Sequence, residues 1–258
     1  MAQVQVTPNP ASDRTLVLLG SMGATHRMWD PQIAELAGRF RIVAMNHRGH
    51  GGAPAPPGPY TIAELGQEVI AALDDLGVER AGFAGASLGG MIAMWVAAHS
   101  GERVERLALL CTSAHMPPAR LWAERAAAVR EAASLDPIAD AVVGRWLTPT
   151  FALANPGVVA DLRSMLVSVD AEGYAGCCEA IEHMDLRADL GSIACPTLVI
   201  AGTHDPAASP EGHGSVIAAG IPGARLEEVP AAHLANIEQP EAVTDLLVGW
   251  LEGGSDGR

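Results

Sequence analysis

Short, continuous apolar runs recur along this chain and alternate with stretches of helical periodicity. The runs are Thr15–Leu19, Arg41–Met45, Ala81–Ala86, Leu107–Cys111, Thr197–Ala201 and Ala224–Val229. Strands buried on both faces have this character, whereas half-exposed strands alternate apolar and polar residues. Because strands separated by helices form βαβ units, the sequence predicts an α/β fold with a mostly parallel central sheet flanked by helices.

One of the intervening helices can be placed in detail. Thr61 and Glu64 match the T-x-x-E capping box, in which each side chain accepts a hydrogen bond from a backbone N–H of the first turn. Apolar residues then recur on one helical face, and Gly77 provides the stop. The pattern predicts a helix that begins after Thr61 and ends near Gly77.

The pattern changes between residues 116 and 190. Strand-like runs are absent there, and helical patterns such as Leu121–Ala133 and Val158–Val167 replace them. A helical block between two strand-bearing halves is typical of an insertion that covers a sheet. We therefore predict a core formed by residues 1–115 and 191–258, with a helical cap inserted at residues 116–190.

The charge balance narrows the choice of partners. Sixteen basic and thirty acidic residues give a formal net charge of −14. Such a field repels nucleic acid and anionic membranes, so we expect neither as a partner. It also means that an anionic substrate would need locally placed positive charge. A small-molecule partner is the expectation, and a homo-oligomer is compatible with the sequence.

Targeting and cysteine signals indicate a cytoplasmic protein. The segment MAQVQVTPNP lacks a basic stretch followed by an apolar run, and no apolar segment approaches the roughly 20 residues that span a bilayer. The spacing of the four cysteines fits neither a zinc site nor a disulfide framework. We expect reduced thiols and no metal.

The segment Gly85-Ala86-Ser87-Leu88-Gly89 is the strongest chemical motif. It follows a predicted strand and opens the helical run Met91–Ala98. A nucleophile elbow needs such a sharp strand-to-helix turn, and flanking glycines leave room for it. The N-terminus of the following helix would point its N–H groups toward a developing oxyanion. The motif therefore predicts Ser87 as a catalytic nucleophile.

A serine hydroxyl needs a base to remove its proton, and chain order selects one among nine histidines. His233 follows the last predicted strand, and Asp205 lies four residues past Thr197–Ala201. The order serine, acid, histidine is that of α/β hydrolases. We predict His233 as the base and Asp205 as the acid that orients it, and rank His204 and His213 well below His233.

The oxyanion needs backbone donors. One should come from the loop after the first core strand, Gly20-Ser21-Met22-Gly23, and we assign it to the Met22 amide, together with the Leu88 amide. His47 and His50 could suggest a metal pair, but two histidines without a third ligand nearby favour a structural turn.

Beyond these motifs, the chain resembles the 3-oxoadipate enol-lactonases (β-ketoadipate enol-lactone hydrolases) of bacterial aromatic catabolism, in the α/β-hydrolase superfamily. The resemblance covers nearly the whole length and rests on Met28-Trp29-Asp30, Arg48-Gly49-His50-Gly51, GASLGGMIAMWVAAH, EGYAGCCEAIEHMDLRADLGSI, CPTLVIAG, IPGAR and AAHLANIEQP. GASLGG marks only the superfamily, whereas EGYAGCCEAI with MDLR, and AHLANIEQP, are more discriminating. The chain departs from the superfamily pattern with Asn46 before R-G-H-G and with Gly20-Ser21 in place of His-Gly.

The resemblance implies that the lactone ring is opened by Ser87 and that the acyl-enzyme is hydrolysed to 3-oxoadipate, with no metal or organic cofactor. The substrate carries a carboxylate, for which an arginine is the usual partner. The cap candidates are Arg120, Arg125, Arg130, Arg145 and Arg163. Arg145 and its neighbour Trp146 are our preferred substrate-binding residues.

The same constellation would also serve a carboxylesterase, a carbon–carbon bond hydrolase or a cofactor-free perhydrolase. A ligand receptor without turnover, built on the same fold, is an alternative of a different class. Hydrolysis of an activated aryl ester that depends on Ser87 would separate the enzymes from the receptor.

Overall fold

A computed structural model describes residues 3–253 of the chain. Within that range, the strands form a seven-stranded sheet in the order β1-β3-β2-β4-β5-β6-β7. The strands are β1 (Gln3–Thr7), β2 (Thr15–Leu19), β3 (Arg41–Asn46), β4 (Ala81–Ala86), β5 (Val104–Leu110), β6 (Thr197–Gly202) and β7 (Arg225–Val229). Only the β1–β3 pair is antiparallel among them. The predicted mostly parallel α/β sheet is confirmed, and each predicted run lies on a strand.

Strand β1 is the one described strand that was not predicted. Its sequence QVQVT alternates polar and apolar residues, and it forms the edge of the sheet with every residue at least partly exposed. The buried strands β2 and β4, by contrast, are buried at every position. The edge strand therefore lacks the continuous apolar run by which the inner strands are recognised.

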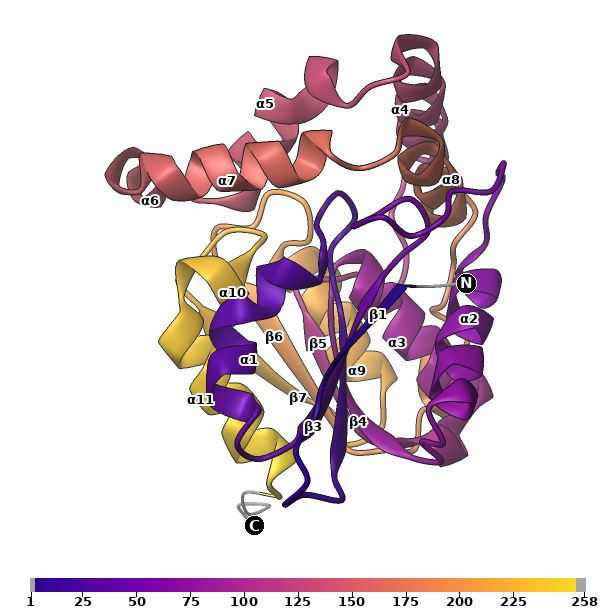
Figure 1. Cartoon of the computed structure of the whole chain (residues 1–258), viewed down its shortest axis with the longest axis vertical. Coiled ribbons are helices and arrows are strands. Elements are labelled where there is room, and N and C mark those ends of the chain that lie inside the picture. Colours follow the sequence, from indigo (N-terminus) through magenta and orange to yellow (C-terminus); the bar gives the residue numbers. More distant parts are fainter. Residues whose placement is uncertain (1–2, 254–258) are drawn as a thin grey trace.

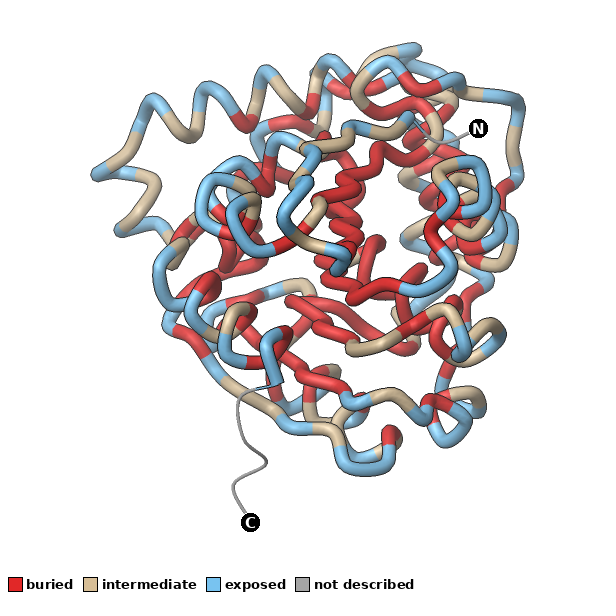
Figure 2. The backbone as a smooth tube through the Cα atoms, turned by 60° about the horizontal axis from the view of Figure 1, so that its bottom comes forward, coloured by how far each residue is buried: buried red, intermediate tan, exposed pale blue. Residues whose placement is uncertain are grey.

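Helices cover both faces of the sheet (Figure 1). The helices of the core are α1 (Asp30–Leu36), α2 (Ile62–Asp75), α3 (Leu88–His99), α9 (Ser215–Gly220), α10 (Ala235–Glu238) and α11 (Pro240–Leu251). Helix α1 packs on α11, and α2 packs on α3. Figure 2 shows the buried chain concentrated in the interior, with exposed residues on the outer turns. No helix within residues 3–253 is both long and apolar enough to cross a membrane.

The predicted capping box at the start of α2 is confirmed. The Glu64 N–H donates to the Thr61 hydroxyl oxygen at 3.1 Å, and the Thr61 N–H donates to the Glu64 carboxylate at 2.9 Å. Gly77 follows the helix with a φ of 65°, which a glycine adopts without strain.

Between β5 and β6 the chain forms α4 (Ala119–Ala132), α5 (Asp136–Trp146), α6 (Pro149–Ala154), α7 (Pro156–Val167) and α8 (Ala171–Glu182). These helices form a layer over one end of the sheet (Figure 1). Helix α4 packs along α8. We call this helical insertion the cap; its limits at residues 116 and 190 stay a prediction.

The start of α8 meets the core backbone to backbone. The Asp170 N–H donates to the Gly49 carbonyl oxygen at 2.9 Å. A Cβ at Gly49 would lie 2.6 Å from the Gly173 Cα, and one at Gly173 would lie 2.5 Å from the Gly49 Cα. Because no real Cβ tolerates such distances, both positions require glycine, and this side of the cap is held closely to the core.

Candidate active site

Ser87 occupies the turn between β4 and α3. Its φ of 54° and ψ of −118° lie in a strained region for a residue with a side chain. A Cβ at Gly85 would lie 2.4 Å from the Gly89 carbonyl oxygen, and one at Gly89 would lie 2.3 Å from the Leu19 carbonyl oxygen. The two glycines of the motif therefore permit the turn that presents the Ser87 side chain at the end of the sheet.

The structure brings the three predicted side chains together. His233 Nε2 lies 2.9 Å from Ser87 Oγ, and His233 Nδ1 lies 2.8 Å from Asp205 Oδ2. Asp205 follows β6, and His233 lies between β7 and α10. Because the carboxyl ends of parallel strands share one edge of the sheet, three residues distant in sequence meet there.

The hydrogen-bond partners determine which atoms of Ser87, His233 and Asp205 carry protons. A carboxylate only accepts, so Nδ1–H of His233 donates to Asp205 and Nε2 is left to accept the Ser87 hydroxyl. The other Asp205 oxygen accepts the Ala207 N–H at 2.8 Å and the Ala208 N–H at 3.1 Å. Burial raises the pKa of Asp205, but His233 and the two amides outweigh it and hold the pKa below its ordinary value. The carboxylate is thus kept ionised beside the imidazole.

The two predicted oxyanion donors lie on segments that are bonded to each other. Leu88 is the first residue of α3, so its N–H has no acceptor within the helix. Met22 lies in the loop after β2 and contacts the cavity that contains Ser87. The Gly89 N–H donates to the Gly20 carbonyl oxygen at 3.0 Å, which joins the loop to the elbow.

His47 and His50 each contact the backbone of the loop that contains Met22. His47 Nε2 lies 2.8 Å from the Gly20 carbonyl oxygen, and the Gly23 N–H donates to His50 Nε2 at 2.9 Å. Burial and the nearby His47 lower the pKa of His50 to about 3, so His50 stays neutral and can accept that bond. Within residues 3–253, no group of three or more His, Cys, Asp or Glu side chains is placed to hold a metal ion.

The cavity over Ser87 is small and lies between the core and the cap. Its volume is about 50 Å³, and it is lined by core and cap residues, namely Ser21, Met22, Ser87, Met91, Met116, Trp122, Arg125, Val142, Arg145, Trp146, Tyr174, Ile181, Ala207 and His233. Both preferred substrate-binding residues, Arg145 and Trp146, are among them. Most of the wall is apolar, and its cationic groups come from the cap.

Ion pairs distinguish the five candidate arginines of the cap. Arg120 pairs with Glu124, Arg130 pairs with Glu172 and Glu179, and Arg163 pairs with Asp136 and Asp140. Arg125 stacks over the Trp122 ring at 4.9 Å, and neither it nor Arg145 forms an ion pair with a described carboxylate. These two unpaired guanidinium groups are the ones that line the cavity.

The surroundings of Arg145 disfavour the charged form of its guanidinium group. Burial, together with the positive charge of Arg125, lowers the pKa of Arg145. A half-buried cation beside a like charge is stabilised by any anion that enters the cavity. The cavity thus holds two cationic groups without carboxylate partners among the described residues, in a protein with a net charge of −14.

Tyr174, on α8, is a site residue that the sequence did not identify. Its side chain is fully buried and lines the cavity; burial raises the pKa of its hydroxyl, and the neighbouring Arg125 and Arg145 oppose that shift. A tyrosine inside the segment EGYAGCCEAI carries no local signal of this kind. The two lower-ranked histidines have other partners: His213 Nδ1 contacts Ser113 Oγ at 2.7 Å, and His204 Nδ1 contacts the Thr203 hydroxyl.

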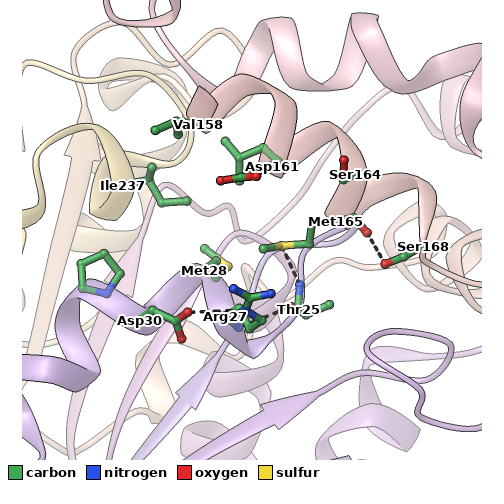
Figure 3. A pocket seen from close by; sticks show the side chains of 12 residues that line it. Thr25, Arg27, Met28, Asp30, Val158, Asp161, Ser164, Met165, Ser168 and Ile237 are labelled. Carbon is green, nitrogen blue, oxygen red and sulfur yellow. Dashed lines mark hydrogen bonds and ion pairs between the residues drawn. The ribbon is translucent and has the colours of Figure 1, made fainter. Parts of the chain in front are cut away.

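A second, larger cavity lies between α7 and the loop after β2 (Figure 3). Its volume is about 540 Å³, and neither Ser87 nor His233 lines it. The Thr25 N–H donates to Met165 Sδ across it at 3.2 Å, and Arg27 pairs with Asp30 on its core side. This cavity is a cleft between cap and core that lacks the reactive residues.

Comparison with known proteins defines the class of this enzyme. Residues 14–145 match the family model of the alpha/beta hydrolase fold. A 3-oxoadipate enol-lactonase of Acinetobacter baylyi is 40% identical over 88% of this chain and 84% of its own, and a second from the same organism is 33% identical over 94% and 90%.

A solved structure agrees with these relatives. The enol-lactonase from Burkholderia xenovorans superposes with a TM-score of 0.94 at 39% identity, covering 97% of this chain and 96% of its own. The chain belongs to the α/β-hydrolase family and, within it, to the 3-oxoadipate enol-lactonases.

Proposed function

We propose that the chain hydrolyses 3-oxoadipate enol-lactone to 3-oxoadipate through an acyl-enzyme on Ser87. The observation that carries the mechanism is the continuous line from Ser87 Oγ through His233 to Asp205, with distances of 2.9 and 2.8 Å. Membership in the enol-lactonase family supports the substrate.

In the acylation step, Ser87 Oγ attacks the lactone carbonyl carbon and His233 Nε2 takes the hydroxyl proton. The negative charge that develops on the carbonyl oxygen is held by the amides of Met22 and Leu88. The ring C–O bond then breaks, and the leaving enolate oxygen stays tethered to the acyl group. Protonation by His233 or by solvent gives the ketone.

Deacylation repeats the same chemistry with water. His233 removes a proton from the water as it attacks the acyl carbon, and it returns that proton to Ser87 Oγ as the ester bond breaks. Asp205 remains ionised throughout and stabilises the imidazolium that forms in each step. The product, 3-oxoadipate, then leaves the cavity.

We assign recognition of the substrate carboxylate to Arg145, with Arg125 adding positive charge nearby. The two guanidinium groups line the cavity without ion-pair partners among the described carboxylates. An arginine fork can donate two parallel hydrogen bonds to a carboxylate, which fixes orientation as well as charge. Trp146 supplies an apolar wall against the lactone ring.

The assignment predicts strong discrimination between substrates. The wild-type enzyme should hydrolyse the enol-lactone with a kcat/KM at least about 100-fold above that for 4-nitrophenyl acetate, because the neutral ester makes no bond to Arg145. Steady-state kinetics on both substrates in one buffer measure the ratio. Comparable kcat/KM values would refute the lactonase assignment and leave a general esterase.

Replacement of Arg145 should affect the two substrates differently. Arg145→Met is expected to lower kcat/KM for the enol-lactone about 100-fold, because the bound carboxylate loses its charged partner, while 4-nitrophenyl acetate hydrolysis changes little. Arg145→Lys should recover part of the loss, since the charge returns without the fork. Arg163→Met, which removes a surface guanidinium, is the matched control. Equal losses on both substrates would exclude the carboxylate role.

We also propose a cytoplasmic setting and a small-molecule substrate as the partner, with a homo-oligomer left open. The four cysteines all lie in the described range and are free thiols, three of them buried. Unpaired thiols persist in a reducing compartment. The net charge of −14 disfavours nucleic acid and anionic membrane surfaces as partners.

A further inference from the structure

Glu238, the last residue of α10, has a buried carboxylate that the mechanism above does not use. Its exposure is 6%. Oε2 accepts the Ala232 N–H and the Thr148 N–H, each at 3.0 Å, and Oε1 accepts the Thr148 hydroxyl. No described Lys, Arg or His forms an ion pair with it. Because burying a carboxylate costs free energy that only these hydrogen bonds offset, the groups they join indicate its role.

The bonds of Glu238 join two parts of the active site. Ala232 directly precedes His233, whose ring contacts both Ser87 and Asp205. Thr148 is the N-cap residue of α6 and lies in the segment that carries Arg145 and Trp146. A second hydrogen bond, from the Leu234 N–H to the Trp146 carbonyl oxygen at 2.9 Å, joins the same two segments.

We propose that Glu238 is a positioning residue that fixes the loop of His233 to the cap segment of Arg145. This inference rests on the proposed function for the role of Arg145. The guanidinium holds the substrate carboxylate, and His233 serves the carbonyl at the other end of the same molecule. One carboxylate that accepts from both segments sets the distance between the two ends of the substrate site.

The two halves of the link can be weakened separately. Thr148→Val removes the hydroxyl bond on the cap side and leaves the Thr148 N–H and Ala232 N–H bonds. Because the same hydroxyl also caps α6 by accepting the Phe151 N–H, Thr148→Ser, which retains the hydroxyl, is the matched control. Glu238→Met removes every acceptor at a similar side-chain length, so both sides weaken. Glu238→Gln keeps an oxygen for the two backbone N–H groups and an NH₂ that can donate to the Thr148 hydroxyl, and is the matched control. Each variant is assayed with the enol-lactone and with 4-nitrophenyl acetate, and its competent sites are counted by titration with a fluorophosphonate.

Per competent site, Thr148→Val should lower kcat/KM for the enol-lactone about tenfold, chiefly through KM, and leave the neutral ester within about twofold. Thr148→Ser should remain near wild type on both substrates. Glu238→Met should lower kcat about tenfold on both substrates, because the loop of His233 loses its anchor, whereas Glu238→Gln should stay near wild type.

Other results would overturn the proposal. Wild-type kinetic constants per titrated site in Glu238→Met, with only a lower melting temperature, would reduce Glu238 to a scaffold role. Equal effects of Thr148→Val on both substrates would remove the link to Arg145. If the wild type itself does not prefer the lactone, the proposed function fails, and the ester assay of Glu238→Met still decides the link to His233.

Discussion

Ser87→Ala should lower kcat for the enol-lactone by about 10⁶-fold, the size of effect seen when a serine nucleophile is removed from a complete triad. Alanine retains the elbow and the oxyanion amides, so only the attacking oxygen is lost. The residual rate should resemble catalysis by the remaining binding site alone. Progress curves at high enzyme concentration measure it, and mass spectrometry of quenched turnover should show the acyl adduct in the wild type only.

Ser164→Ala is a matched control for this prediction. Ser164 is an exposed serine in the cleft of Figure 3, and its loss should leave kcat unchanged. A Ser87→Ala enzyme that retained more than about 1% of the wild-type kcat would show that another group attacks the carbonyl.

Asp205→Asn is expected to lower kcat by about 10⁴-fold. The asparagine amide would donate to His233 Nδ1, which places the remaining ring proton on Nε2 and leaves no acceptor for the Ser87 hydroxyl. The geometry is retained while the tautomer is wrong. Steady-state kinetics measure the loss, and Asp161→Asn, a change on the exposed rim of the second cleft, should have no such effect.

The same substitution should change the pH dependence of stability. The pKa of Asp205 is lower in the folded protein than its ordinary value, so its ionisation stabilises the fold at a pH above the unfolded-state pKa. That contribution is lost as the pH falls through the lower folded-state pKa. Denaturant titrations at a series of acidic pH values should show a shallower loss of unfolding free energy in Asp205→Asn; parallel curves would contradict it.

The parts of the fold that the sequence predicts are those with a local cause. The buried parallel strands appear as continuous apolar runs, and the elbow appears as Gly85-Ala86-Ser87-Leu88-Gly89 because its turn leaves no room for side chains. Chain order then points to Asp205 and His233, which the fold brings within hydrogen-bond distance. Edge strand β1 was not predicted, because a partly exposed strand does not need a continuous apolar run.

The carboxylate site could be predicted only as a set of candidates. Arg125 and Arg130 lie on the same helix, α4. Only the fold shows that Glu172 and Glu179, 42 and 49 residues further on, neutralise Arg130. Pairing across the cap is a tertiary property. The same holds for Glu238, whose acceptor role depends on Thr148, 90 residues before it.

The attachment of the cap has a consequence for how substrate gains entry. A cavity of about 50 Å³ is far below the roughly 300 Å³ or more typical of ligand pockets, so a ring-sized lactone needs more room than this structure provides. Gly49 and Gly173 anchor the α8 side by main-chain contact, which cannot yield without breaking backbone packing. On the α7 side the fully buried Leu166 packs on Gly23 of the core, and the Thr25 N–H donates to Met165 Sδ beside an open cleft. The cap is thus attached by main-chain contacts at two places, at the start of α8 and at the end of α5, where the Leu234 N–H donates to the Trp146 carbonyl oxygen.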